Sequence, residues 1–457
     1  MYVTDDRAVS IESGLAMRVR LTPVVLIVAV VVSSCGGSVG PNEWTMVGMT
    51  PDERHILITT LFGGVASGCT RWEGWEVDES EERVDVSALV WRKSFPSGCT
   101  DEGVTETIEV DLSEPLGTRE LAGCGTDDCR GLEPEFWFGS WEVDAVTSQD
   151  GVVVANAGAL WSFSNDGADM WTHDPGARQL LQATLDVVVT YDGQTTMAYD
   201  PSTGVEIWQA DGYVVADDEG TVYVCRSEDA EVLAAVDIET GAERWQANLP
   251  CGYLAVRGDL ITIVAIDRDV DGGHELLLVN SSSGDVTLRK TLDDGTDDQV
   301  NGFEGVVVAG DRVVIAGQQA DLVVLGSDAE ELVRRPARLG TPIGVADDLV
   351  IVAAHDRVSA INPTNGETAW ESQALNRDSL AVSEDTLWSL DTQTGSVSRL
   401  DPETGNPIWT TPVGLSSGFD VAASPSTAYV ATSLAIVALD SSTGEVKWWQ
   451  HLPFEQP

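Results

Sequence analysis

The chain has 457 residues, of which 43% are hydrophobic and 22% are charged, which is ordinary for a globular protein with more than one core. Its charge is unusual, because 75 Asp and Glu residues stand against 25 Lys and Arg and give a net charge of −50. Such a surface repels nucleic acid and anionic lipid headgroups, so we expect no nucleic-acid partner.

The first element along the chain is a targeting signal. Met17 to Arg20 is basic, and residues 21–32 are an apolar run too short to span a membrane. The run ends in Val32-Ser33-Ser34-Cys35, which resembles the lipobox of bacterial lipoproteins. The resemblance implies a signal peptide over 17–35, cleavage before Cys35, and acylation of the Cys35 sulfur. We therefore expect a lipid anchor on the extracytoplasmic face of the cell membrane.

Two alternatives to this signal are a plain secretory signal and an uncleaved anchor. Residues 1–16 are acidic and fit no signal peptide, which leaves both Met1 and Met17 open as the start of translation.

A small β-domain is predicted over residues 45–135, after a tether over 36–44. Apolar and polar residues alternate over 55–62, 84–91 and 105–112, as in antiparallel strands with one solvated face. No long helical period follows the signal. The function of this domain is not readable from its sequence.

A repeat fills the rest of the chain. Ala198-Tyr199-Asp200-Pro201-Ser202-Thr203-Gly204 with Trp208 has the pattern A-x-D-x-x-T-G-x-x-x-W. Eight copies place the Trp or its replacement 37 to 45 residues apart, at Trp171, Trp208, Trp245, Leu288, Val333, Trp370, Trp409 and Trp448. A fixed period of this length predicts stacked units, each with four short strands between turn signals.

This pattern is similar to that of the PQQ-like (quinoprotein-type) repeat family. The resemblance covers about residues 141–457 and implies an all-β fold, an eight-bladed β-propeller. In that family the motif Trp docks onto the neighbouring blade, so the six tryptophans are expected to be structural and not a binding box for an aromatic ligand.

Six cysteines remain once Cys35 is assigned to the lipid, an even number for an oxidising compartment. Cys69 and Cys99 lie in near-identical Ser-Gly-Cys-Thr contexts, and we pair them. The other two predicted disulfides are Cys124–Cys129, in a tight loop, and Cys225–Cys251, on two loops expected at one face of the propeller. Zinc ligation is the competing reading, but the spacings do not fit it.

Catalytic chemistry is not expected. The resemblance also covers PQQ-dependent dehydrogenases, which carry long insertions, a bound calcium, a general-base Asp and adjacent cysteines. This chain has no Cys-Cys dipeptide and short repeats. Its five histidines, residues 55, 173, 274, 355 and 451, are scattered without a motif. We therefore predict no PQQ and no catalytic residue.

One candidate metal loop remains. Asp267, Asp269, Asp271 and Glu275 occupy positions 1, 3, 5 and 9 of a calcium-loop pattern with Gly272 at position 6. Position 12 is Leu278, where an EF-hand needs Glu, and the alternative is a solvated acidic loop. This insertion and residues 293–298 are predicted to form one acidic patch that binds calcium or a basic protein surface.

Together these features predict a non-catalytic, membrane-anchored propeller that holds an envelope protein or a small ligand. Two alternatives remain open: a quinoprotein-like dehydrogenase, and a ligand sensor that works with a membrane partner.

Overall fold

The structure is a computed structural model. It describes residues 37–63, 69–93, 103–125, 129, 144–148, 151–156, 159–173, 179–183, 187–218, 220–226, 232–267, 273–292, 303, 305–317, 321–326, 329–335, 340–354, 357–373, 375, 380–383, 386–391, 394–416 and 419–452. Within these ranges every regular element is a β-strand, which confirms the all-β class. No helix in them has the length and apolar character needed to cross a membrane.

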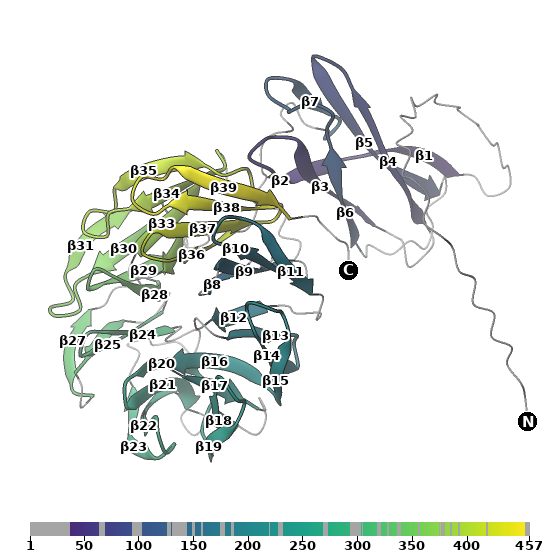
Figure 1. Cartoon of the computed structure of the whole chain (residues 1–457). Helices are drawn as coiled ribbons and strands as arrows, with labels where there is room; N and C mark the ends of the chain where they lie inside the picture. The colour runs from purple at the N-terminus through teal and green to yellow at the C-terminus, as the bar shows by residue number, and fades with distance from the viewer. Residues whose placement is uncertain are drawn as a thin grey trace, which may run out of the picture.

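Strands β1 to β7 form two sheets, drawn in purple and blue in Figure 1. They enclose a buried cluster to which Trp44, Ile56 and Val86 belong, and the Trp44 indole donates a 2.8 Å hydrogen bond to the Val86 carbonyl. One sheet contains β2 (Trp44–Met49), β3 (His55–Gly63) and β6 (Gly103–Asp111), and the other β1 (Gly37–Asn42), β5 (Arg83–Lys93), β4 (Thr70–Glu79) and β7 (Glu120–Ala122). We call these two sheets the N-terminal sheets.

The predicted tether over 36–44 is wrong for most of its length. Gly37–Asn42 is strand β1, which pairs antiparallel with β5 from Gly37 opposite Lys93 to Asn42 opposite Ala88. The segment has few apolar side chains, so its pattern does not announce a strand. Its backbone N–H and C=O groups nevertheless pair with the edge of β5, and pairing of this kind depends on the neighbour and not on side-chain pattern.

Eight four-stranded antiparallel sheets follow in the described part of the chain, each with its strands in chain order. We call them blades 1 to 8. The first four are blade 1, with β8 (Asp144–Thr147), β9 (Gly151–Asn156), β10 (Ala159–Ser164) and β11 (Asp169–His173); blade 2, with β12 (Gln179–Ala183), β13 (Val188–Tyr191), β14 (Thr195–Tyr199) and β15 (Glu206–Asp211); blade 3, with β16 (Tyr213–Asp218), β17 (Thr221–Cys225), β18 (Val232–Asp237) and β19 (Glu243–Asn248); and blade 4, with β20 (Tyr253–Arg257), β21 (Leu260–Asp267), β22 (Gly273–Asn280) and β23 (Val286–Leu292).

The other four blades repeat this order. They are blade 5, with β24 (Gly305–Ala309), β25 (Arg312–Ala316), β26 (Leu322–Leu325) and β27 (Glu331–Arg335); blade 6, with β28 (Thr341–Ala346), β29 (Leu349–Ala354), β30 (Arg357–Ile361) and β31 (Thr368–Ser372); blade 7, with β32 (Leu380–Ser383), β33 (Thr386–Asp391), β34 (Ser396–Leu400) and β35 (Pro407–Pro412); and blade 8, with β36 (Phe419–Ala423), β37 (Thr427–Thr432), β38 (Ala435–Asp440) and β39 (Val446–His451).

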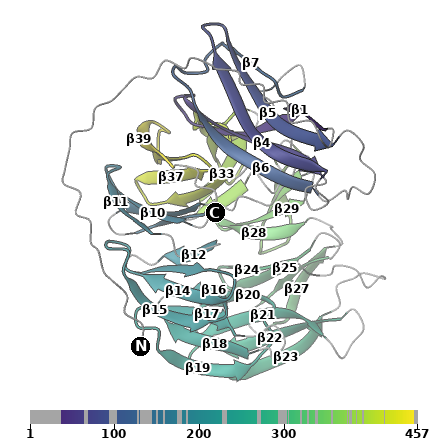
Figure 2. The same cartoon turned by 90° about the vertical axis from the view of Figure 1, so that its right-hand side faces the viewer.

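The blades are arranged in a ring (Figures 1 and 2). First strands of neighbouring blades contact each other, as β20 contacts β24 and β24 contacts β28, and the first strand of blade 8, β36, contacts β8 of blade 1. In blades 3, 5 and 8 the second and third strands are almost fully buried, because each blade packs its faces against its neighbours.

The turn between the third and fourth strands is built by the repeat motif. In blade 2, Asp200 Oδ1 accepts hydrogen bonds from the backbone N–H groups of Ser202 (2.8 Å) and Thr203 (2.9 Å), and Gly204 has a φ of +68°. In blade 8, hydrogen bonds from the Ser442 hydroxyl and from backbone N–H groups lower the pKa of Asp440 to about 2. The motif Asp is therefore the cap of a turn.

The motif tryptophans join each blade to the next. Trp208 of blade 2 donates a 2.7 Å hydrogen bond to the Ile238 carbonyl in the motif turn of blade 3. Gly241 of that turn lies against the Trp208 ring, where a Cβ would be 2.6 Å from the Trp208 side chain. The other five make the same bond, Trp171 to Pro201, Trp245 to Ser281, Trp370 to Pro402, Trp409 to Ser441 and Trp448 to Asn165. We call this contact the interblade seam.

The last of these bonds joins blade 8 back to blade 1. Trp448 donates a 2.9 Å hydrogen bond to the Asn165 carbonyl, and Gln450 donates a 2.7 Å bond to the Gly167 carbonyl. On the first strands, the Ala145 N–H donates a 2.8 Å bond to Asp420 Oδ2. No strand of blade 1 comes from the C-terminal end of the chain, so these side-chain and backbone contacts join the two blades without a shared sheet.

The seam after blade 4 lacks both the Trp and the facing Gly of the motif. Blade 4 has Leu288 in place of the Trp, and the next turn has Ala329 in place of the Gly, with a φ of +58°. Leu288 packs against the buried cluster that contains Ala329. At the six seams with a Trp, the ring leaves no room for a Cβ on the facing glycine, and at the Val333 seam a Cβ on Gly366 would lie 2.5 Å from the Val333 side chain. Leu288, in contrast, packs beside the Ala329 Cβ. The two replacements therefore compensate each other across one seam.

Truncation of a seam tryptophan should destabilise the ring. Trp208 is only 8% exposed, so Trp208→Ala removes a buried ring and a hydrogen bond and is expected to cost about 3–5 kcal/mol. Leu288→Ala at the equivalent position should cost less. Thermal melts followed by circular dichroism check the order, and a neutral Trp208→Ala would contradict the structural role.

The compensation between Leu288 and Ala329 predicts a coupled pair. Leu288→Trp alone should lower the melting temperature through overpacking, at a cost of about 1–3 kcal/mol. Ala329→Gly alone should be neutral or stabilising, because it relieves a positive φ. The double variant should recover most of the loss. Effects of the two changes that simply add would show that the positions do not share a seam.

Candidate functional site

The N-terminal sheets meet the ring at a junction made partly of backbone. Gly48 of β2 forms an antiparallel bridge with Ser416, and the Met49 N–H donates a 2.7 Å hydrogen bond to the Leu415 carbonyl. These two segments of the chain approach closely because each has a glycine at the junction, Gly48 in one and Gly414 in the other. A Cβ on Gly48 would lie 2.9 Å from Ser433 Oγ, and one on Gly414 would lie 2.3 Å from the Met49 carbonyl oxygen.

Buried side chains seal this junction. Val47 and Leu57 of the N-terminal sheets pack with Leu434, which follows β37 of blade 8. Leu415, between blades 7 and 8, belongs to the core of the N-terminal sheets. A junction with a paired backbone and a shared apolar core holds the two parts in one orientation.

Two histidines and a glutamate gather at the rim of the junction. Glu109 Oε1 lies 3.0 Å from His55 Nδ1 and 2.5 Å from His451 Nε2. The imidazole rings of His55 and His451 are stacked, with centroids 4.0 Å apart and planes 20° apart. His55 begins β3, Glu109 lies on β6 and His451 ends β39, so both parts of the molecule contribute. We call His55, Glu109 and His451 the junction triad.

The sequence interpretation of these histidines as scattered is corrected by the fold. Nothing near His55 or His451 in the chain forms a motif, and the two lie at opposite ends of the described residues. A partial signal is present in β6, where Glu109 and Asp111 alternate so that both face the side of His55; Asp111 lies directly opposite His55 in the register. The partner His451 could not be found without the docking of blade 8.

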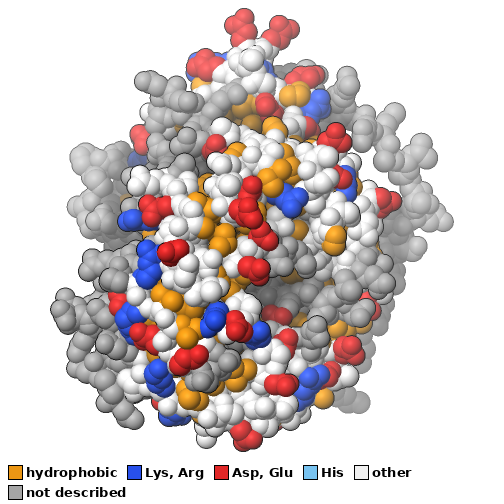
Figure 3. All heavy atoms as spheres, turned by 90° about the vertical axis from the view of Figure 1, so that its left-hand side faces the viewer, with side chains coloured by type: hydrophobic (Ala, Val, Ile, Leu, Met, Phe, Trp, Pro, Cys, Tyr) orange, Lys and Arg blue, Asp and Glu red, His pale blue; other side chains and the backbone are white. Residues whose placement is uncertain are grey.

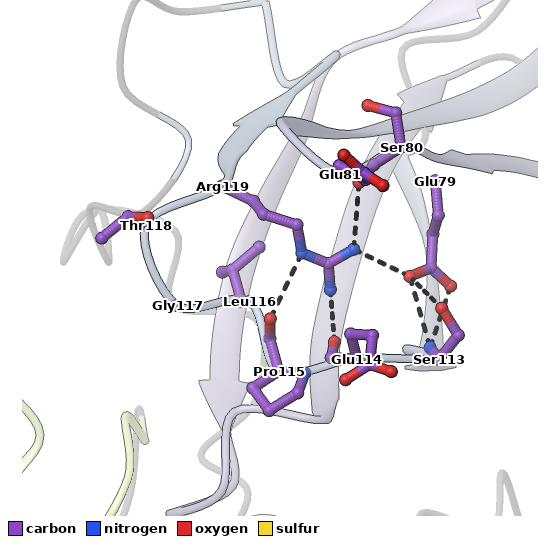
Figure 4. A pocket seen from close by; sticks show the side chains of 10 residues that line it. All are labelled: Glu79, Ser80, Glu81, Ser113, Glu114, Pro115, Leu116, Gly117, Thr118 and Arg119. Carbon is purple, nitrogen blue, oxygen red and sulfur yellow. Dashed lines mark hydrogen bonds and ion pairs between the residues drawn. The ribbon is translucent and has the colours of Figure 1, made fainter.

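A pocket in the N-terminal sheets surrounds Arg119 (Figure 4). Arg119 is 10% exposed and forms a 3.0 Å ion pair with Glu79, and it also donates to the carbonyls of Glu114 and Pro115. Burial opposes ionisation of Glu79, but hydrogen bonds from Ser113 and Arg119 outweigh it and lower the pKa of Glu79. These charges hold the segment 113–119 in place and are satisfied internally.

Two of the three predicted disulfides are present in the described structure, and the third involves a cysteine that lies outside it. Disulfides join Cys124 to Cys129 and Cys225 to Cys251, as the sequence analysis expected. Cys225 ends the second strand of blade 3 and Cys251 lies in the connection to blade 4. Cys69 is disulfide-bonded, while Cys99 lies outside the described residues. Neither described disulfide joins adjacent cysteines, so they do not fit the cysteine pair that the PQQ enzymes place under their cofactor.

The predicted calcium loop falls mostly outside the described residues, as do Cys35 and residues 293–298. Asp267 ends β21, where it pairs with Gly273, and Asp269 and Asp271 are not described. Glu275, on β22, forms a 3.0 Å ion pair with Arg289. The calcium hypothesis therefore stays a prediction.

The outer strands leave single apolar side chains exposed next to the seam residues. Figure 3 shows apolar side chains among acidic and basic ones on the left-hand face of Figure 1. Exposed examples on fourth strands are Ile207, Val286, Leu332, Ile408 and Val446. Surfaces of this mixed kind are compatible with protein partners but do not by themselves define a site.

Comparison with known proteins identifies the repeat. A family model described as outer membrane protein assembly factor BamB matches residues 149–372, 299–394 and 393–456. No curated protein matches the chain significantly in sequence. Similar solved structures include BamB from Moraxella catarrhalis (16% identity, 68% of this chain and 97% of the other, TM-score 0.46) and apo AztD from Citrobacter koseri (12% identity, 69% of this chain and 96% of the other, TM-score 0.50).

Removal of the Arg119 charge should loosen the N-terminal sheets in a pH-dependent way. Arg119→Gln leaves Glu79 partly buried with its hydrogen bonds from Ser113 but without its ion pair, at an expected cost of about 1–3 kcal/mol at neutral pH. The pKa of Glu79 is lowered in the folded protein. The ionised Glu79 therefore stabilises the fold fully above the usual pKa of 4.5, and this stabilisation is lost as the pH falls through the lowered pKa. Melting temperatures of wild type and variant should therefore converge as the pH falls below 4.5 and through the lowered pKa. A gap that stays constant with pH would contradict this role of the pair.

Proposed function

The chain belongs to the family of outer membrane protein assembly factor BamB, the PQQ-like β-propellers, and from this we propose that it is a lipid-anchored scaffold that holds another protein at the extracytoplasmic face of the cell membrane. In this proposal the eight blades form one closed eight-bladed propeller over residues 141–457, and the N-terminal sheets form a separate small β-domain within 45–135, extended by β1. The protein is non-catalytic and carries no PQQ.

The observation that carries this proposal is the use of the motif residues. The side chains that recur in every regular repeat, Asp and Trp, are occupied in turn caps and interblade hydrogen bonds. Recognition must therefore come from residues that differ between blades, which are those of the loops, the outer strands and the N-terminal sheets. This division is typical of propellers that bind proteins through loops on a rigid ring.

The junction supports a scaffold in a second way. The backbone bridge at Gly48 and the shared apolar core fix the N-terminal sheets against blades 7 and 8. A partner that contacts both parts would meet a preformed surface and would lose little conformational entropy on binding. The net charge of −50 favours a partner with a basic surface.

The anchor is tested at Cys35. Cys35→Ser should yield protein that takes up no label from a radioactive or alkyne-tagged fatty acid and that leaves the membrane fraction, because the sulfur that accepts the diacylglyceryl group is absent. Ser34→Ala, which keeps a small residue before the Cys, is the matched control and should be labelled like wild type. A labelled, membrane-bound Cys35→Ser variant would overturn the anchor.

The binding role is tested by crosslinking in intact cells, followed by purification of the chain and mass spectrometry. The proposal expects one envelope protein to be recovered reproducibly with wild type. Protein purified from the native membrane with a bound quinone, visible by its absorbance and acting on an alcohol or sugar, would replace the scaffold with the dehydrogenase alternative.

A further inference from the structure

The junction triad has the composition and spacing of a metal-binding site. Its three donor atoms, one from each residue, all lie within 4.8 Å of one another. Two imidazole nitrogens and one carboxylate oxygen form a ligand set that suits zinc and neighbouring divalent transition metals, whereas magnesium and calcium prefer oxygen alone. The three side chains are each partly exposed, at 25% for His55, 13% for Glu109 and 25% for His451, so an ion can reach them from solvent.

Contacts within the protein leave one of these donors without a hydrogen bond. His451 Nε2 is buried and makes none in the described structure, although Glu109 Oε1 is only 2.5 Å away. Two acceptor atoms at this distance repel each other unless a proton or a metal ion lies between them. A buried polar atom in this state is destabilising unless something else binds it.

A shared ion requires the three side chains to move apart from the positions they have in the structure. Ligand atoms about 2.0–2.1 Å from a tetrahedral zinc lie roughly 3.3–3.5 Å from each other. The separations of 3.0 Å from Glu109 Oε1 to His55 Nδ1 and 2.5 Å to His451 Nε2 are shorter than this range. A bound ion lies in the plane of each imidazole, so the two rings must also turn out of their stacked arrangement to share it. Asp111 Oδ1, 2.8 Å from His55 Nδ1 and on an exposed side chain, adds negative charge beside the site.

We propose that His55, Glu109 and His451 bind one divalent transition-metal ion of the zinc class, which joins the N-terminal sheets to blade 8. His55 and Glu109 come from neighbouring strands β3 and β6, and His451 comes from the end of β39, which lies beside them in Figure 1. The ion supplies a coordination bond to each part at a junction that otherwise depends on a backbone bridge and apolar packing. A fourth position remains open to water or to Asp111.

This proposal does not depend on the scaffold function, and its test measures the metal directly. The full chain, with its disulfides formed and the Cys35 sulfur acylated or alkylated so that no thiol competes, is stripped with a chelator and titrated with zinc against a chromophoric zinc indicator. We expect one equivalent to bind and the melting temperature to rise with zinc. Cobalt in place of zinc should give the visible absorption of a low-coordinate nitrogen–oxygen site.

Variants on each side of the junction locate the ion. His55→Ala and His451→Ala should each weaken zinc binding by at least about tenfold and abolish the rise in melting temperature. Glu109→Gln, which keeps the size of the side chain, tests the carboxylate if an alanine variant does not fold. His173→Ala is the matched control, because His173 is an exposed histidine on β11 of blade 1, and it should bind zinc like wild type.

Three results would overturn the proposal. They are no stoichiometric zinc on wild type, zinc binding by His451→Ala that equals wild type, and loss of binding in His173→Ala to the same degree as in His451→Ala. The first result would assign the triad to a direct imidazole–carboxylate contact between the two parts. The other two would place the bound zinc elsewhere on this acidic surface.

Discussion

The interblade seam is the contact on which the rest of the structure depends. A four-stranded sheet cannot bury both of its faces, so each blade is stable only against its neighbours. The tryptophan of one blade meets the motif turn of the next through an indole hydrogen bond and a glycine that leaves room for the ring. The turn itself exists because Asp caps it and Gly accepts its positive φ. One short motif thus determines a turn, a strand pair and a contact between sheets.

Closure of the ring joins blade 8, at the C-terminal end of the described chain, to blade 1. Trp448 and Gln450 bond to the motif turn of blade 1, which brings β39 to the side of the molecule where the N-terminal sheets dock. The junction then uses Gly48, Gly414 and their neighbours for a close backbone approach that larger residues would prevent. His451 reaches Glu109 only because both events occur, the closure of the ring and the docking of the sheets. The junction triad is therefore a consequence of the whole fold.

Sequence reasoning reached the parts of the structure that repeat or that lie close in the chain. The motif gave the family, the four-stranded units and the role of the tryptophans, and the irregular units with Leu288 and Val333 were recognised by their spacing. Two cysteine pairs were also found, from loop length for Cys124–Cys129 and from blade geometry for Cys225–Cys251. The tether was misread because β1 pairs by its backbone and shows little side-chain pattern. The histidines were read as scattered because chain distance conceals spatial neighbours.

There is a physical reason why some features follow from the amino-acid sequence and others only from the tertiary structure. The repeat motif determines the structure of a few residues and of the contact with one neighbouring blade. Because the motif recurs along the chain, it can be recognised from the sequence. The sequence by itself therefore determined the class of fold, the unit of repetition and the residues of the seam. The match of Leu288 with Ala329, the docking of β2 on Ser416 and the gathering of His55, Glu109 and His451 each occur once, between residues whose pairing is set by packing. Only the tertiary structure decided them, because a contact that occurs once between residues distant in the chain produces no recurring pattern in the sequence.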